Sequence, residues 1–115
     1  MSDNLPVLDY KKAIQQVSGS KQLADDLLQM LIKELPDYKH TLQQAQENDS
    51  KEEIDKILHK MHGGLRYVSA PALTQLVSNT RSELSTLNNT QLQCAVELIG
   101  QECKRVISQG NYNIE

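Results

Sequence analysis

The chain has 115 residues, of which 38% are hydrophobic and 23% are charged, and its formal net charge is −3. This length supports one domain with its own core, and the negative charge argues against nucleic-acid binding through phosphate neutralisation. No apolar run approaches the roughly 20 residues that a membrane span requires, and the polar N-terminus does not resemble a signal peptide. Three prolines and five glycines are too few for a fold rich in tight turns. We therefore expect an all-helical, cytoplasmic domain.

Two helices are predicted in the first half of the chain. The first is a short leader from about residue 8 to residue 18, with Asp9 near its start. The second begins after Ser20, and its apolar residues recur at helical spacing; they include Leu23, Leu27, Met30, Leu31 and Leu35. Pro36 lacks a backbone donor and must kink or end this helix. We favour one kinked helix that resumes to about Glu47, and two separate helices are the alternative.

Three more helices are predicted in the second half. The segment from Ser50 to Glu53 matches a capping box, so the third helix starts there and reaches Arg66 or Tyr67. Pro71 suits the first turn of a fourth helix, and Gly110 is expected to end the last one. Four amphipathic helices with short connections predict an antiparallel four-helix bundle with a short N-terminal leader helix. The single domain covers residues 1–115, with a core from about 8 to 109 and frayed ends.

The two cysteines lie on the last predicted helix. Cys94 and Cys103 are nine residues apart, which places them about 13 Å apart on opposite faces. They cannot form a disulfide with each other within that helix, and two unpaired thiols fit a reducing compartment. Cys103 joins the apolar stripe of the helix and is predicted to be buried, whereas Cys94 points elsewhere.

The third predicted helix turns one histidine away from the core. Advancing 100° per residue from Ile54, the apolar residues fall near one line, whereas His59 lies about 140° away. Gly63, one turn after His59, lies at about 180°. The interior glycines Gly63 and Gly64 each cost the helix about 1 kcal/mol relative to alanine, which a helix used only for packing has little reason to accept. We therefore predict an exposed His59 beside a bare stretch of backbone.

An exposed imidazole in this setting is suited to attack a phosphoryl group. Neutral imidazole is a good nucleophile near pH 7, because the unperturbed pKa of histidine is about 6.5. Phosphoryl transfer needs groups that position and neutralise charge, and Arg66, or His62 when protonated, can bind phosphoryl oxygens. The sequence contains no glycine-rich phosphate loop and no acidic cluster for magnesium, so we expect no autonomous kinase or ATP-binding activity.

The segment Leu58-His59-Lys60-Met61-His62-Gly63-Gly64 resembles the signature of histidine-containing phosphotransfer (HPt) domains. In that family a phosphoacceptor histidine is followed by a basic residue three positions later and by glycine at the fourth. The likeness extends from about residue 8 to residue 109, and it is greatest to the C-terminal module of tripartite hybrid sensor kinases. The resemblance implies a bacterial two-component phosphorelay intermediate, which accepts a phosphoryl group from one receiver-domain aspartate and passes it to a response-regulator aspartate.

The resemblance also implies roles for individual residues. His59 takes the role of the phosphoacceptor, and Gly63 and Gly64 provide access for a partner. His62 stands where the family usually has lysine or arginine, and Arg81, on the fourth helix, stands where many members have glutamine. The candidates for binding the phosphoryl group are His62, Arg66 and Arg81.

Partners follow from the same resemblance. They are the receiver domain of a hybrid histidine kinase and the receiver domain of a response regulator. Magnesium is supplied by the receiver, and no cofactor or metal is expected on this domain. We expect a monomer without nucleic-acid or direct membrane contact, either free-standing or as the cytoplasmic C-terminal part of a membrane-bound sensor kinase. Leu28 and Ile32 are expected to extend the core rather than to dock a receiver.

Two other functions remain open on the residues alone. Asp55, His59 and His62 share a helix face at positions i, i+4 and i+7, and this spacing could supply three metal ligands. A metal site leaves the paired glycines unexplained. The second alternative is a non-catalytic helical adaptor that binds a partner through an exposed groove, and such an adaptor would tolerate His59→Gln.

Overall fold

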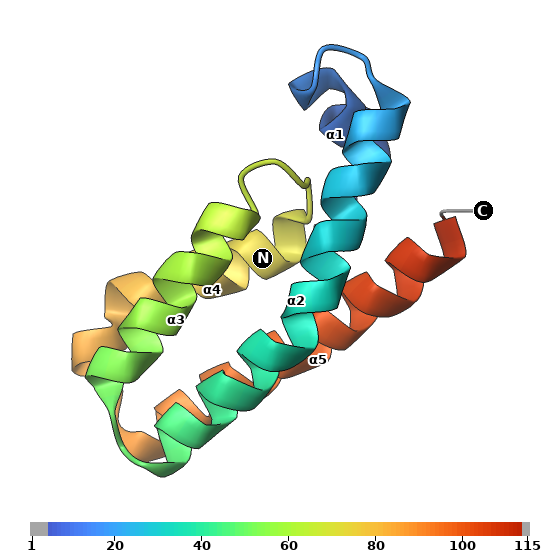
Figure 1. Ribbon diagram of the computed structural model, residues 1–115. Helices are drawn as coiled ribbons and strands as arrows, with labels where there is room; N and C mark the ends of the chain where they lie inside the picture. The colour runs from blue at the N-terminus through green and yellow to red at the C-terminus, as the bar shows by residue number, and fades with distance from the viewer. Residues whose placement is uncertain (1–4, 114–115) are drawn as a thin grey trace.

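The computed structural model describes residues 5–113, which form five α-helices and one 3₁₀ segment (Figure 1). The elements in chain order are α1 (Tyr10–Gln16), α2 (Lys21–Glu47), α3 (Lys51–Gly64), α4 (Pro71–Glu83), the 3₁₀ segment η1 (Leu84–Thr86) and α5 (Asn89–Asn113). Residues 5–113 contain no β-strand. The all-α prediction is confirmed.

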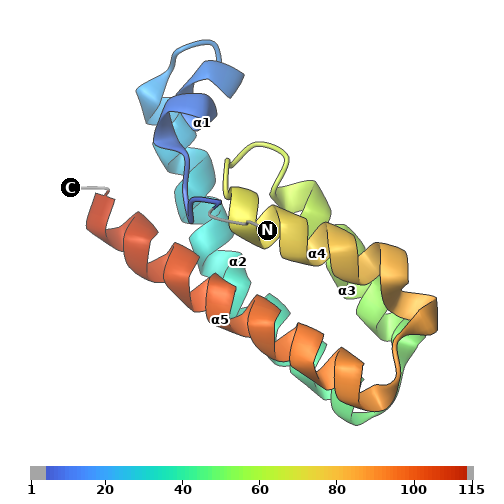
Figure 2. The same ribbon diagram turned by 180° about the vertical axis from the view of Figure 1, so that it is seen from behind.

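The helices α2 to α5 form an antiparallel bundle. Each packs against two others in a ring, with α2 on α3, α3 on α4, α4 on α5 and α5 on α2. Figure 2 shows α3 and α4 side by side, and α5 running along the bundle to the C-terminal end of the described chain. The short helix α1 lies outside this ring and packs on α2. This is the predicted four-helix bundle with a leader helix.

Helix α2 passes through Pro36 without interruption, as the favoured prediction had it. Figure 1 shows α2 changing direction partway along its length, as a helix with an interior proline does. Leu28 and Ile32 are buried, which confirms them as core residues. Leu23 and Met30, by contrast, are 45% and 59% exposed, so the inward face of α2 is rotated from the stripe that the leucines suggested.

The ends of the helices differ from prediction by up to a turn. Helix α1 is shorter than the predicted range of 8–18 because the chain reverses at Ser18 and Gly19, which have φ angles of 59° and 84°. The Asp9 carboxylate caps α1 by accepting a hydrogen bond from the Lys12 backbone N–H at 3.1 Å. Helix α3 ends at Gly64 and does not reach Arg66.

Gly110 does not end α5, so that prediction was wrong. The helix continues to Asn113, and Gly110 lies buried in it. A Cβ atom at this position would overlap Cδ1 of Ile32 on α2. Glycine is present because two helices approach each other closely here, and their packing outweighs its poor helix propensity. Residues 111–113, in the segment 111–115 that was predicted to fray, continue α5, and residues 114 and 115, like 1–4, lie outside the described part.

The core of the bundle is aliphatic, as expected for a chain whose aromatic residues are all tyrosine. Cys103 is fully buried and Cys94 is exposed, as predicted. Burial raises the pKa of the Cys103 thiol to about 12. No helix in the described range 5–113 is long and apolar enough to cross a membrane.

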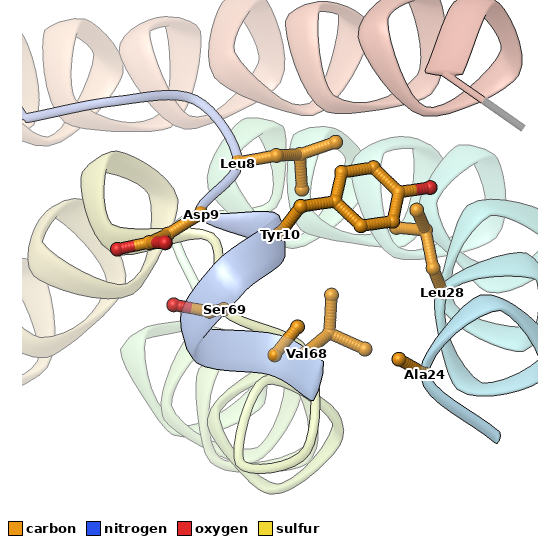
Figure 3. Close-up of a pocket in the computed structure, with 8 residues that line it drawn as sticks. Leu8, Asp9, Tyr10, Ala24, Leu28, Val68 and Ser69 are labelled. Carbon is orange, nitrogen blue, oxygen red and sulfur yellow. The ribbon is translucent and has the colours of Figure 1, made fainter. Parts of the chain in front are cut away.

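The leader helix is joined to the loop between α3 and α4. The Asp9 backbone N–H donates a hydrogen bond to the Ser69 carbonyl oxygen at 2.8 Å. Beside it, Tyr10 covers a small pocket between α1, α2 and this loop (Figure 3). Burial and the nearby Asp25 raise the pKa of Tyr10. The pocket is lined by Leu8, Asp9, Tyr10, Ala13, Ala24, Leu28, Val68 and Ser69. The leader therefore holds the loop that follows α3.

Candidate functional site

The helix that carries the candidate site is fixed along its inner face. Ile54, Leu58 and Met61 are 0% exposed, so α3 cannot rotate without breaking the core. Its first turn is capped by Ser50, whose Oγ accepts a hydrogen bond from the Glu53 backbone N–H at 3.2 Å. The side-chain Nζ of Lys51 donates to the Leu87 carbonyl oxygen at 2.7 Å, which ties this end of α3 to the link between η1 and α5.

His59 lies on the outer face of this fixed helix. The side chain of His59 is exposed, and so is Gly63 one turn later. A Cβ atom on Gly63 would meet nothing within 4 Å. The helix therefore presents an imidazole next to uncovered backbone, which is the arrangement that the sequence predicts.

Gly64 occupies a different environment from Gly63. It is half-buried and faces α2, where a Cβ atom would lie 3.6 Å from Leu31 Cδ1 and 3.9 Å from Glu34 Oε1. These are ordinary contact distances, so the space there would accept a methyl group. Open space beside His59 is thus supplied by Gly63, and Gly64 lies at the junction between α3 and α2.

Arg81 of α4 reaches the same flank of α3 through an ion pair. Its Nε donates to Asp55 Oδ1 at 3.1 Å, and Asp55 lies one helical turn before His59. The side chains of Arg81 and Asp55 are 36% and 49% exposed. The sequence places Asp55 on the flank of His59, but it contains no signal that Arg81 pairs with it, because helical periodicity does not fix contacts between helices.

His62 and Arg66 lie at the C-terminal end of α3. His62 is half-buried and lines a groove formed by the end of α3, the loop that follows it, α4 and α1, together with Lys12, Leu65 and Thr74. Arg66 follows the end of the helix and is exposed. The structure therefore brings Arg81 to Asp55, places His62 in this groove, and leaves Arg66 beyond the last turn.

The alternative metal site is not formed. Among residues 5–113, no group of three or more histidine, cysteine, aspartate or glutamate side chains is placed to hold a metal ion. Asp55, one of the three candidate ligands, is instead paired with Arg81. The spacing i, i+4, i+7 along one helix was therefore not enough to predict a metal site, because Asp55 pairs with Arg81 of the neighbouring helix α4.

Comparison with known proteins identifies a family and several relatives. The model of the Hpt domain family matches residues 26–109. The signal transduction histidine-protein kinase BarA of Escherichia coli (strain K12) is 30% identical over 77 residues, which cover 67% of this chain and 8% of that protein. The sensor protein GacS of Pseudomonas syringae pathovar syringae is 30% identical over 67 residues, which cover 58% of this chain and 7% of that protein. The matched segments are thus less than a tenth of these relatives.

A solved structure has the same fold. The HPT domain from an Hpt sensor hybrid histidine kinase from Shewanella superimposes with a TM-score of 0.84, and the match covers 92% of both chains at 22% identity. At this identity the likeness concerns the fold alone. The family match covers well over half of the chain and implies phosphotransfer in two-component signalling. The protein therefore belongs to the Hpt domain family.

Proposed function

We propose that this protein is a phosphorelay intermediate in which His59 accepts a phosphoryl group from a receiver-domain aspartate and passes it to a response-regulator aspartate. The observation that carries the proposal is the pairing of an exposed His59 with Gly63, where an added Cβ would meet nothing within 4 Å. A partner's active site can close over an imidazole only if the surface beside it is free, and Gly63 leaves it free.

The transfer step needs little from this domain beyond a positioned nucleophile. The Nε2 lone pair of His59 bonds to phosphorus as the bond from phosphorus to the receiver's aspartate oxygen breaks, and the aspartate leaves as a carboxylate. The second transfer reverses these bond changes on another receiver. Such phosphoryl transfers pass through a loose, in-line transition state, so positioning and charge neutralisation supply the catalysis. The buried inner face of α3 supplies the positioning.

Cationic side chains around His59 would neutralise the phosphoryl oxygens. We assign this part to Arg81, Arg66 and protonated His62, with Arg81 already held one turn from His59 by Asp55. Magnesium belongs to the receiver in this scheme, and the domain binds no cofactor of its own. Gly63 keeps the approach open, and Gly64 faces α2.

The proposed setting is the cytoplasm, either as a free-standing monomer or as the C-terminal part of a membrane-bound hybrid kinase. The similarity to short segments of the histidine-protein kinase BarA and the sensor protein GacS supports a place within a longer signalling protein. The partners are then one receiver domain in a hybrid kinase and one in a response regulator.

The test is transfer from a phosphorylated receiver domain in the presence of magnesium. The protein should acquire an acid-labile, base-stable label, and His59→Gln should abolish it. His40 is a matched control because it is an exposed histidine on α2, so His40→Gln should label normally. ATP alone should leave the protein unlabelled. Label retained in folded His59→Gln would refute the proposal, and receiver binding without any label would favour the adaptor.

A further inference from the structure

We infer that Asp55 is a positioning residue for phosphoryl transfer, which holds Arg81 by its Nε so that the remaining guanidinium donors face a phosphoryl group on His59. This inference rests on the proposed function of His59. It assigns a role to a carboxylate beside a site that must bind an anion, where a negative charge would by itself be unfavourable.

The first observation is the placement of the pair. Asp55 lies four residues before His59 on α3, and residues at this spacing are neighbours on a helix surface, with Cβ atoms about 5–6 Å apart. Arg81 reaches Asp55 from α4 with a distance of 3.1 Å between Nε and Oδ1. The ion pair thus joins α3 to α4 next to the proposed phosphoacceptor.

The second observation is how the guanidinium is held. A guanidinium has five N–H donors, of which one is on Nε and four are on the two Nη atoms. Asp55 accepts from Nε, and within the described part of the chain the Nη atoms have no hydrogen-bond partner. The Arg81 side chain is 36% exposed, so these donors can reach an incoming group. Asp55 therefore restrains Arg81 while leaving free the donors that suit bidentate binding of phosphate.

The charges of the pair give the inference its most specific consequence. Near a phosphoryl group, the Asp55 carboxylate is repulsive unless Arg81 neutralises it. With Arg81 present, loss of Asp55 frees the guanidinium and transfer slows. With Arg81 replaced by glutamine, loss of Asp55 removes the repulsion and transfer speeds up. The effect of Asp55→Asn therefore changes sign with the residue at position 81.

A purely structural role would behave differently. If the pair only joined α3 to α4, Asp55→Asn would lower the stability of the protein that retains Arg81, would have little effect once Arg81 is replaced, and would leave the transfer rate unchanged. If the pair contacted only the docked receiver, its loss would raise the receiver concentration needed for half-maximal rate. A positioning role lowers the maximal rate and leaves that concentration unchanged.

The experiment measures single-turnover transfer to His59 from a phosphorylated receiver over a range of receiver concentrations. Asp55→Asn should lower the maximal rate about 3- to 10-fold, which is the size of the net contribution of a typical hydrogen bond between partly exposed side chains, and Asp55→Glu should restore most of it. Arg81→Gln should be slower than Asp55→Asn, and the double variant should be faster than Arg81→Gln alone. Circular dichroism confirms that each variant is folded.

Glu53→Gln is the matched control. Glu53 is another exposed carboxylate on α3, and it pairs with Lys56 at 3.7 Å between Oε2 and Nζ. Glu53→Gln changes the net charge by the same amount as Asp55→Asn and leaves the contact to Arg81 intact. The maximal transfer rate of Glu53→Gln should therefore match that of the wild type. An unchanged rate in Asp55→Asn, a change confined to the half-maximal concentration, or the same direction of effect in both backgrounds would overturn the inference. Label in His59→Gln would instead refute the proposed function.

Discussion

Gly110 of α5 packs directly on Ile32 of α2, and Cδ1 of Ile32 fills the space that a Cβ on Gly110 would need. Gly63 of α3 has the opposite surroundings, because an added Cβ there meets nothing within 4 Å. Both glycines lie inside helices and carry the same cost in helix propensity. One is retained for packing between helices, and the other leaves an open surface beside His59.

Alanine substitution should separate these two roles. Gly63→Ala should raise the free energy of unfolding by up to about 1 kcal/mol, because alanine favours the helix and has room. Gly110→Ala should lower it by about 1 kcal/mol, since overpacking costs about 1–3 kcal/mol and outweighs the gain in propensity. Urea unfolding followed by circular dichroism measures both. Equal stabilisation by the two substitutions would contradict the close contact between α5 and α2.

A bulkier side chain at position 63 should block transfer while the protein stays folded. Gly63→Gln places a flexible amide beside His59, where the partner's active site must approach, and we expect transfer at least about 10-fold slower, which corresponds to about 1.4 kcal/mol in activation free energy. The rate is measured with a phosphorylated receiver. Gly64→Ala is the control, because its methyl group would point toward α2 at ordinary contact distance. A normal rate in Gly63→Gln would show that access does not depend on this glycine.

The start of α3 should depend on Ser50. Its hydroxyl is the side-chain cap of the helix that carries His59, so Ser50→Ala should lower the free energy of unfolding by about 1 kcal/mol. Ser50→Asp should retain most of the stability, because aspartate is also a good N-cap. Thermal unfolding of the wild type and the two variants tests this prediction. If Ser50→Ala unfolded at the same temperature as the wild type, the cap would be dispensable.

The two thiols should react at very different rates. Cys94 is exposed, whereas Cys103 is fully buried and its pKa is raised to about 12. The thiolate is the reactive form, so an alkylating reagent at pH 8 should modify one thiol in the folded protein and both in urea. Mass spectrometry of the labelled protein gives the count. Rapid modification of both thiols without urea would mean that the α5 core opens readily.

Stability should fall at alkaline pH. The Cys103 pKa is raised from 9.0 to about 12 by folding, so above pH 9 the unfolded state binds fewer protons than the folded one. Stability is therefore fully present below about pH 9 and declines toward pH 12, by at most about 1.4 kcal/mol per pH unit from this group. Urea unfolding between pH 8 and pH 10 measures the slope. Cys103→Ala should flatten it, and an unchanged slope would assign the decline to other groups.

The local features of this protein can be predicted from short stretches of its sequence. The Ser50 cap and the outward angle of His59 were predicted correctly, because each depends on spacing within one helix. The end of α5 was predicted wrongly, because the packing of Gly110 against Ile32 involves residues far apart in the chain. The same limit applied to the face of α2, where Leu23 and Met30 point outward although their spacing is helical.

By itself, the sequence determined that the chain is helical, where α3 begins and which histidine it turns outward, because backbone propensity and a period of 3.6 residues act locally. Only the tertiary structure decided that α2 continues through Pro36, that Gly110 is a packing residue and that Arg81 is held by Asp55. These outcomes depend on how one helix is rotated and spaced against another. That arrangement is set by side-chain packing across the whole bundle.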